Sequence, residues 1–565
     1  MKKRTKKLAA LLVTGCMAAS ALAGCAAGGK DSSGDTKAQT DGAEVKTEAG
    51  AADGTSADST DGEHMESAAQ TDAGQAEGAA ADGEVTELDI FINMNWWPVD
   101  TFTGIIPEEI QTKTGVKLNI TVAADDKQLG LMIASNEIPD LVFADKELDR
   151  LSSSQFCYSY DELIQQYAPD FKANDLMANV ARSFSQDEHY YTLLNCLSTN
   201  EEWAEAPAGA PGQACIYYRK DIYEKMGSPK LENLDDFMSV CGQVKEEYPD
   251  MVPFGLGGFW KLQPIAAWMG ASTTGGNAYQ PLDDGSTVHY VSAPEYKGFL
   301  QYANALAREG YMSAEAYANE NEGDSHQAAY NGDCFAYTWY LSPSSLQTLN
   351  TESQKINPEA EWAVLRPLGG ENAAYGISKG WGGLFISKEC KAPDKAIKFV
   401  EYLFSEEGRH LSKWGREGIE YTLNDDGLPE FSDEWKETKK DPEAMNKKYN
   451  QYFYFGVNAV DELLGDYMDM SDEDLADCTA YKDGYKNYPE IGIAVPVSSS
   501  DEGVIEAKLK EMLKAEEARV IFSADDEEFE KNYEGMMKNA EKIGVESLNT
   551  YMTERVKEVK EKYGL

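Results

Sequence analysis

The sequence predicts an α/β fold in which helices alternate with the strands of a largely parallel sheet. Short apolar runs, such as 88–92 and 141–144, indicate buried strands, and longer periodic segments with Gly or Pro turns indicate the helices between them. Alternation of this kind is typical of parallel sheets covered by helices. The chain has 565 residues, enough for two or more domains with their own cores.

The first elements follow this pattern closely. After the opening strand at 88–92, the segment 104–123 predicts a helix, a turn at Gly115 and a second strand. The segment 127–145 then gives a helix, a proline turn and the apolar strand 141–144. Because α/β sheets bind ligands at the carboxyl ends of their strands, the loops that follow these strands are expected near a binding site.

A second α/β set follows an Ala-, Gly- and Pro-rich segment at 200–213. It begins with a strand that runs into helices at 214–250, and it includes the strand-like 332–340. From 376 the pattern gives a strand, a loop and a long helix. The last part of the chain is polar and predicts helices, with breaks near Gly535 and Gly544.

The N-terminus has the features of an export signal. Five basic residues precede an apolar stretch, Leu8 to Ala23, that is too short for a comfortable membrane span. "LAGC" at 22–25 follows and resembles the bacterial lipobox, in which the chain is cut before a cysteine that then carries lipid. The resemblance implies a lipoprotein signal peptide at 1–24 and lipidation, with palmitate, at Cys25. The alternative is an ordinary cleavable signal with an incidental cysteine.

The segment 25–84 predicts a disordered acidic tether. Residues 26–84 contain 14 acids, 3 lysines and no aromatic residue, a net charge of −11, so they have nothing to bury. The whole chain has a formal net charge of −47, and without the signal (+5) and the tether (−11) it keeps −41. A folded part this acidic is not expected to bind nucleic acid, which needs a basic face.

Six blocks of the remaining sequence resemble the extracellular solute-binding proteins of ABC importers, in the family 1 group of oligosaccharide-binding lipoproteins. The blocks occur in the family's order and are "EEIQTKTGVKLNI", "LMIASNEIPDLVF", "YYRKDIYEKMGSPKLENLDDFMSVCGQVKEEYPD", "LAREGYMSAE", "ISKECKAPDKAIKFVEYLFSEEG" and "GREGIEYTL". The resemblance implies a two-lobed, periplasmic-binding-protein-like fold of type II whose lobes are joined by hinge crossovers. It implies an N-terminal lobe at 85–212 and 370–425, a C-terminal lobe at 213–369, and a mostly helical region at 426–565. The hinge is expected near Gly209–Gln213 and Arg366–Gly376.

The tryptophans indicate where such a protein would hold its ligand. Trp362 and Trp435 are expected in cores, and Trp268 suits a core or a site equally. Other tryptophans stand beside glycines, polar residues or loop breaks, and sugar sites need aromatic platforms next to a few fixed polar groups. With three polar residues that follow strand ends, the expected ligand-binding residues are Asn95, Trp96, Trp97, Asp145, Glu147, Trp260, Trp268, Trp339 and Trp381.

The adjacent rings of Trp96 and Trp97 are expected to have different roles. Side chains alternate along an extended chain, so one core face does not easily bury both indoles. One ring should anchor the loop and the other should face the cleft. Because Pro98 restricts the residue before it to extended conformations, Trp97 is expected to be the rigidly aimed platform and Trp96 the anchor.

The sequence therefore predicts a monomeric binding protein, lipid-anchored on the extracellular face of a cell membrane of Gram-positive type. It would capture an oligosaccharide and deliver it to an ABC permease, with no enzymatic activity, cofactor or metal. Two alternatives stay open. One is a surface glycan-active enzyme, which needs two carboxylates at a fixed separation. The other is a peptide- or lipid-binding protein on the same scaffold.

Two local motifs are not expected to have a chemical role. "GISKG" at 376–380 has the spacing of a hydrolase nucleophile elbow around Ser378, but a strand-like segment follows it, and His410 is the single later histidine. "DYMDMSDEDLAD" at 466–477 is rich in acids but lacks the acid pattern and the glycine of a calcium loop. The seven cysteines after Cys25 are an odd number without a C-x-x-C pair, so they are expected as scattered core residues.

Overall fold

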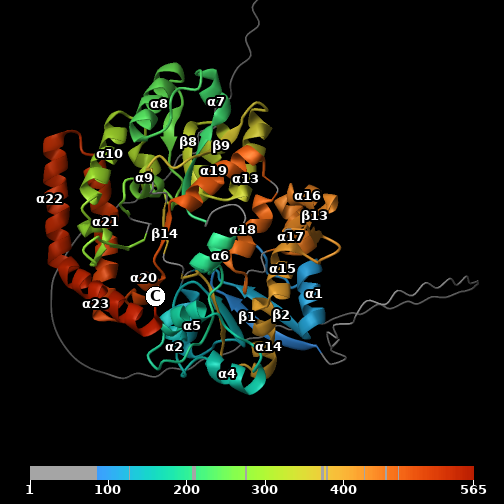
Figure 1. The fold of residues 1–565 in the computed structure, drawn as a ribbon. Helices are drawn as coiled ribbons and strands as arrows, with labels where there is room; N and C mark the ends of the chain where they lie inside the picture. Colours follow the sequence, from blue (N-terminus) through green and yellow to red (C-terminus); the bar gives the residue numbers. More distant parts are fainter. Residues whose placement is uncertain are drawn as a thin grey trace, which may run out of the picture. The chain divides into compact units, whose positions relative to one another are not determined.

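Two four-stranded sheets organise the part of the chain that the computed structural model describes. That part comprises residues 85–125, 127–206, 212–273, 277–370, 374–376, 379–425, 427–451, 455–468 and 470–565. The predicted signal peptide at 1–24, the lipidated Cys25 and the tether at 25–84 lie outside the described residues. The mixed α/β architecture predicted from the sequence is confirmed (Figure 1).

The first sheet has the strand order β11-β3-β1-β2. β1 (Thr86–Ile92) pairs in parallel with β2 (Val116–Val122) and with β3 (Leu141–Ala144), and β11 (Gly383–Ile386) adds an antiparallel edge. α1 (Ile105–Thr114) ends at Gly115, whose left-handed φ of 68° suits glycine and lets the chain turn directly into β2. The predicted strands at 88–92 and 141–144 and the turn at Gly115 are thus confirmed.

The second sheet has the order β5-β8-β4-β9 and is mixed rather than parallel. β5 (Val252–Gly255) runs parallel to β8 (Cys334–Tyr340), but β4 (Ala214–Arg219) is antiparallel to both β8 and β9 (Trp362–Leu365). The expectation of a largely parallel sheet therefore holds for the first sheet and is wrong for the second. Alternating helices and strands are compatible with both arrangements, because mixed sheets with antiparallel strands are common in folds that contain both helices and strands.

A short two-stranded pair connects the later part of the chain with an earlier segment. β10 (Ala374–Gly376) pairs in parallel with β14 (Tyr485–Asn487). After it come three long helices, α21 (Asp501–Ile521), α22 (Asp526–Ile543) and α23 (Val545–Tyr563), which lie side by side and are red in Figure 1. Gly544, with φ at 120°, separates α22 from α23, whereas α22 runs through Gly535 without the predicted break.

Helices cover both sheets and fill the C-terminal half. Those that pack directly on sheet strands include α8 (Leu234–Glu247), α9 (Gln263–Trp268), α13 (Pro343–Ile356) and α14 (Pro393–Phe404). The remaining elements are α2 (Gln128–Ser135), α3 (Leu148–Leu151), α4 (Tyr160–Tyr167), α5 (Asp175–Arg182), α6 (Asn200–Glu205), α7 (Lys220–Lys225), β6 (Tyr279–Pro281), β7 (Thr287–His289), η1 (Tyr290–Ser292), α10 (Tyr296–Arg308), α11 (Ala314–Ala318), α12 (Glu322–Asn331), α15 (Glu406–Trp414), β12 (Tyr421–Leu423), β13 (Pro429–Phe431), α16 (Asp433–Lys439), α17 (Pro442–Tyr449), α18 (Ala459–Tyr467), α19 (Asp472–Asp483) and α20 (Pro489–Ala494).

The cores contain the residues that the sequence assigned to them. Trp362 and Trp435 are buried, and six of the seven described cysteines are buried as well, with Cys196 partly so. None of the helices in the described part of the chain is long and apolar enough to cross a membrane. The predicted lobe boundaries stay predictions, although the strands of the first sheet fall in 85–212 and 370–425 and those of the second in 213–369.

Candidate functional site

The two adjacent tryptophans of the β1 loop differ sharply in burial. A turn, in which the Trp97 N–H donates to the Met94 carbonyl at 3.0 Å, folds the chain back over the end of the sheet. Trp97 is 6% exposed, and its ring stacks on Phe455 at 5.9 Å between centroids. Trp96 is 56% exposed and lies 6.0 Å from the ring of Trp381.

The prediction made Trp97 the platform and Trp96 the anchor, and the burial of the two rings is the reverse of what that requires. Pro98 does follow Trp97, but the turn before it decides which ring faces the sheet. Trp97 is also packed edge-on against Phe143 of β3, 5.7 Å away, which fixes it in the core. The exposed ring available to a ligand is therefore that of Trp96.

A pocket of about 480 Å³ lies where the two sheets and the β10–β14 pair meet. Trp381, just before β11 of the first sheet, forms part of its wall. The segment after β5 contributes Phe259 and Trp260, whose ring centroids are 5.1 Å apart, and α9 contributes further residues. We call this the aromatic pocket; its described lining residues are Gly212, Gln213, Ala214, Phe259, Trp260, Gln263, Ala267, Ala271, Ser272, Thr273, Asn277, Gly376, Gly380, Trp381 and Tyr485.

Two glycines let tyrosine hydroxyls approach the wall of the aromatic pocket. A Cβ on Gly212 would stand 1.8 Å from the Tyr340 hydroxyl, and one on Gly376 would stand 1.6 Å from the Tyr485 hydroxyl. Any other residue would force these rings away, because such contacts are impossible for real atoms. Burial raises the pKa of Tyr485, which keeps its hydroxyl protonated and able to donate.

The polar groups of the aromatic pocket are amides and hydroxyls. Gln213, which directly precedes β4, is 8% exposed, and neither atom of its side-chain amide has a hydrogen-bond partner among the described residues. Gln263 on α9 instead donates to the Phe259 carbonyl at 2.9 Å. Thr273 donates its hydroxyl to Glu517 of α21, which also accepts hydrogen bonds from the hydroxyls of Tyr296 and Tyr317. The C-terminal helices thereby brace one wall of the pocket.

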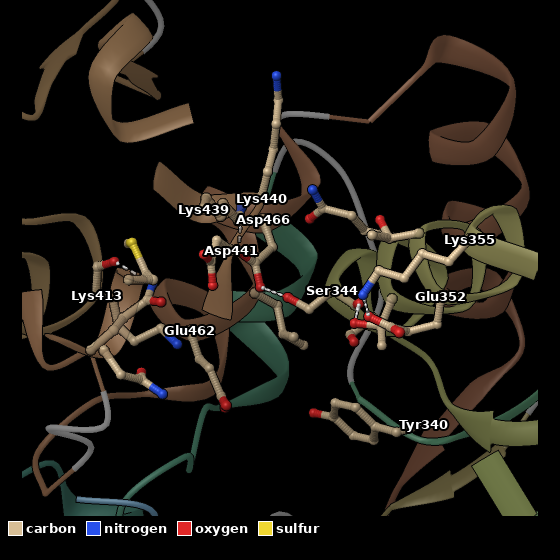
Figure 2. Close-up of a pocket in the computed structure, with 18 residues that line it drawn as sticks. Tyr340, Ser344, Glu352, Lys355, Lys413, Lys439, Lys440, Asp441, Glu462 and Asp466 are labelled. Atoms are coloured by element: carbon tan, nitrogen blue, oxygen red, sulfur yellow. Dashed lines mark hydrogen bonds and ion pairs between the residues drawn. The ribbon is translucent and has the colours of Figure 1, made fainter. Parts of the chain in front are cut away.

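A second cavity of about 630 Å³ has a different lining (Figure 2). Tyr340 lines it and also contacts Trp260 of the aromatic pocket, with 5.5 Å between ring centroids. We call it the charged cavity, because its lining includes Glu352, Lys355, Lys413, Lys439, Lys440, Asp441, Glu462 and Asp466.

The charges of this cavity are largely paired with one another. Lys355 lies 2.6 Å from Glu352, and Lys440 lies 2.6 Å from Glu437 outside the lining. Lys439 lies 2.8 Å from Asp466, which also accepts a hydrogen bond from Ser344 at 2.8 Å, as Figure 2 shows. Such a network stabilises the contact between helices α13, α16 and α18.

Asp466 is a largely buried carboxyl group in the charged cavity whose pKa is shifted by its neighbours. Its burial would raise the pKa of the carboxyl, but the charges of Lys439 and Lys413 and the hydrogen bonds from Lys439 and Ser344 outweigh it and hold the pKa below its usual range. The aspartate is thus ionised and held by its partners.

The structure brings together some of the predicted site residues and separates others. Trp260 and Trp381 line the aromatic pocket, and Trp96 packs against Trp381. Trp268 is 3% exposed and belongs to the core. Trp339 packs against His326, with 4.2 Å between ring centroids, and is not among the lining residues of either cavity.

The three predicted polar residues lie at the strand ends as expected but not in the described lining. Asn95 is exposed in the turn before Trp96. Asp145 is half-buried after β3, and Glu147 forms an ion pair with Arg150 at 2.7 Å. A paired carboxylate is a weaker acceptor for a sugar hydroxyl, since its oxygens already interact.

Several residues of the aromatic pocket were not predicted from the sequence. Gln213 was assigned only to a hinge, and Phe259, Asn277 and Tyr485 were not singled out. Tyr485 comes from the segment 426–565, which the sequence assigned to packing rather than to a site. The signals that point to them are a polar residue directly before a strand and a glycine opposite a tyrosine, and both become specific only once the pairing of strands is known.

The described residues connected with the two local motifs, His410 and Asp466, have ring-stacking or ion-pair partners in the structure. His410 stacks on Trp414 at 3.9 Å, with Nε2 3.7 Å from Asp461 Oδ1, while Ser378 lies outside the described residues. Asp466 of the acid-rich segment is occupied by its ion pair. Within the described ranges, no group of three or more His, Cys, Asp or Glu side chains is placed to hold a metal ion.

Comparisons with known proteins agree with this architecture. A family model for bacterial extracellular solute-binding proteins matches residues 95–410, more than half of the chain. The chain is similar to the solved alginate-binding protein AlgQ2 without calcium ion, with 17% identity, 84% of this chain and 98% of that chain covered, and a TM-score of 0.62. It is similar to the ABC-transporter substrate-binding protein FusA of S. pneumoniae in complex with kestose, at 16% identity, 84% and 100% coverage and a TM-score of 0.62.

A third similar structure is an HMO-binding, ABC-transporter-associated solute-binding protein from Bifidobacterium longum infantis. Its identity is 14%, the coverage is 84% of this chain and 99% of that chain, and the TM-score is 0.58. At such identities the likeness concerns the fold. No curated protein matches the chain.

Proposed function

Because the chain belongs to the bacterial extracellular solute-binding proteins, which serve ABC importers and are not enzymes, we propose that its solute is an oligosaccharide held in the aromatic pocket. Trp381, which precedes β11 of the first sheet, and Trp260, which follows β5 of the second sheet, both line this pocket beside amides and hydroxyls. Aromatic faces match the C–H faces of a sugar ring, and amides match its hydroxyls. The combination of aromatic rings with amides and hydroxyls in one pocket is the main observation that supports the proposal.

The similar solved structures support an oligosaccharide ligand without identifying it. They include an alginate-binding protein, a protein in complex with kestose and an HMO-binding protein. Each statement applies to that protein, and the fold likeness alone transfers no ligand to this chain. The pocket volume, about 480 Å³, falls within the usual range for small-molecule sites of roughly 300–1,000 Å³.

The described lining of the aromatic pocket disfavours the enzymatic alternative and does not decide against the second alternative. A glycan-active enzyme needs two carboxylates flanking the bond that breaks. Among the described residues that line this pocket there is no carboxylate. A peptide- or lipid-binding protein would use the same aromatic rings as apolar contacts, so the choice of ligand must be tested directly.

We further propose that closure about the chain crossings traps the ligand for an ABC permease, and that the protein is an anchored monomer. The crossings expected near Gly209–Gln213 and Arg366–Gly376 include residues outside the described ranges, but Gln213 and Gly376 line the pocket. Closing around a ligand at such a position shifts the population toward the closed state. The lipid anchor at Cys25 and its location on the extracellular face of a Gram-positive membrane belong to this proposal.

A ligand screen by tryptophan fluorescence tests the function. Neutral and acidic oligosaccharides, peptides and fatty acids would be titrated against the protein without its signal segment. We expect saturable changes with oligosaccharides, because two of the pocket rings are indoles, and no shortened products after prolonged incubation. Saturation by peptides or fatty acids alone, or release of shorter sugars, would reject the proposal.

The anchor is tested separately on the full chain. Cys25→Ser should remove the acceptor of the lipid, and the variant should then appear in the medium or remain unprocessed. Partition of the variant into a detergent phase at the level of the parent would show that the lipid is not on Cys25.

A further inference from the structure

The Gln213 side chain is an unusual polar group in the wall of the aromatic pocket. It is 8% exposed, and both its amide oxygen and its amide nitrogen lack partners among the described residues. Its own backbone is fixed, because the Gln213 carbonyl accepts a hydrogen bond from the Leu341 N–H at 2.7 Å. The backbone that carries this amide is therefore held at a defined place on the pocket wall.

Buried amides almost always have hydrogen-bond partners, so an amide without them calls for an explanation. Because Gln213 lines a cavity, a group entering that cavity can supply both partners. A side-chain amide presents a donor and an acceptor next to each other. Two neighbouring hydroxyls of a sugar match this pair, one donating to Oε1 and the other accepting from Nε2.

The lack of charged side chains in the described lining of the aromatic pocket disfavours a strongly anionic ligand. None of the described residues that line it is charged. Lys379 stands next to the lining residue Gly380, but its Nζ lies over the Phe184 ring, 5.8 Å from the centroid, rather than on the lining. A carboxylate brought into such a site would lose its water without gaining a cation.

The neighbouring charged cavity does not supply an available cation for such a carboxylate either. Lys355, Lys439 and Lys440 are engaged in ion pairs with Glu352, Asp466 and Glu437. Asp441 and Glu462 add further negative charge to the same lining. A uronate that reached this cavity would have to compete with carboxylates already in place.

We propose that the aromatic pocket takes an uncharged sugar unit and that Gln213 is its main polar contact, binding a pair of neighbouring hydroxyls. The inference rests on the proposed function and narrows its substrate class to neutral oligosaccharides. It separates this chain from a binder of uronic-acid oligomers that would share the same fold.

A capture experiment tests the class of ligand. The protein would be incubated with one pool that contains oligosaccharides from neutral glycans together with oligomers of pectate and alginate, and the bound fraction would be identified by mass spectrometry. We expect neutral oligosaccharides in the bound fraction. Capture of the uronic-acid oligomers would overturn the inference and leave the proposed function intact, whereas capture of no oligosaccharide would overturn both.

Two glutamine variants test the residue, with the captured oligosaccharide as the probe. Gln213→Ala should weaken binding by about tenfold or more, the loss expected for one important contact. Gln327→Ala is the matched control, because Gln327 on α12 is exposed, donates to Asn331 and lies outside the described lining of both cavities, and it should weaken binding by less than about threefold. Equal affinity of the Gln213→Ala variant and the parent would overturn the role of Gln213.

Thermal unfolding without ligand separates binding from structure. A glutamine that held the wall together would destabilise the protein when removed. Since the Gln213 amide makes no hydrogen bond in the described structure, Gln213→Ala should keep the melting temperature of the parent or exceed it. A marked drop in melting temperature together with normal binding would assign Gln213 to structure and reject the proposal.

Discussion

Tyr340 lies beside both the aromatic pocket and the charged cavity, yet the polar groups of the two differ in whether they have hydrogen-bond or ion-pair partners. In the aromatic pocket the Gln213 amide has no hydrogen-bond partner among the described residues, and the rings of Trp381 and Trp260 form part of the lining. In the charged cavity, Lys439 and Asp466 are 2.8 Å apart and Ser344 adds a hydrogen bond. The charged cavity is the larger of the two by volume, about 630 against about 480 Å³.

The difference teaches that size and charge do not identify a ligand site by themselves. Groups whose interactions are complete contribute to folding, because a ligand would have to break them. Polar groups that are fixed in position but lack hydrogen-bond partners gain the most from a bound ligand. On this criterion we propose that the smaller pocket binds the ligand and that the larger cavity contributes to stability, and the two proposals can be tested independently.

The largest effect is expected from the two tryptophans that follow β1. Trp97→Ala should lower the free energy of unfolding by about 3–5 kcal/mol, because its buried ring packs against Phe455 and Phe143. Trp96→Ala should keep most of the stability and weaken sugar binding, since its exposed ring extends the wall made by Trp381. A central aromatic contact is worth roughly 2 kcal/mol, which corresponds to about 30-fold in the dissociation constant.

Urea unfolding and fluorescence titration on both variants decide this prediction. Each variant is the control for the other, because they remove the same side chain from adjacent positions. If both variants unfold early and bind normally, neither ring contacts the ligand. If Trp97→Ala loses binding while it keeps its stability, the platform is Trp97, as the sequence first indicated.

The next effect concerns the charged cavity. Asp466→Ala should lower the free energy of unfolding by about 3 kcal/mol, because it removes the ion pair with the largely buried ammonium of Lys439 and the hydrogen bond from Ser344. Glu352→Ala breaks the more exposed pair with Lys355 and should cost less than about 1 kcal/mol. Chemical unfolding measures both, and ligand affinity should remain at the parent value in each. A loss of affinity without loss of stability in Asp466→Ala would make the charged cavity the binding site.

The fold could be predicted from the sequence wherever local signals decide it. The strand at 141–144 and the glycine turn at Gly115 depend on an apolar run and on a left-handed C-cap, and both were placed correctly. The direction of β4 in the second sheet depends on its pairing with β8 and β9, which no local pattern encodes. The same limit explains the unbroken helix α22, since packing can hold a glycine such as Gly535 in a helix at a modest cost.

The site was only partly accessible from the sequence for a related reason. Residue type and neighbouring loop breaks identified Trp260 and Trp381 as candidates, and both line the aromatic pocket. The choice between Trp96 and Trp97 depended on a single turn at Met94, and an argument from Pro98 alone missed it. Tyr485 reaches the pocket through the pairing of β14 with β10, which are more than a hundred residues apart in the chain, and no local sequence signal predicts this pairing.

The smallest effect is expected from pH, and it separates the two regions without any mutation. The pKa of Asp466 in the folded protein is below its usual value of about 4, so the unfolded chain binds this proton first as the pH falls. The stability that Asp466 contributes is therefore complete above about pH 4 and is lost below it, toward the folded-state pKa. Asp466→Asn should show less of this acid loss than the parent.

The aromatic pocket should be indifferent to the same change in pH. Its described lining contains no carboxylate, lysine or histidine, and burial raises the pKa of its tyrosine, Tyr485, so that this hydroxyl keeps its proton. The affinity for a neutral oligosaccharide should consequently vary by less than about twofold between roughly pH 5 and pH 8, where ordinary carboxyl and tyrosine groups do not titrate. Titrations across this range, with unfolding measured at each pH, check the prediction. An affinity that rises or falls tenfold while stability stays constant would place an ionisable group in contact with the ligand, and the charged cavity would then have to be part of the binding site.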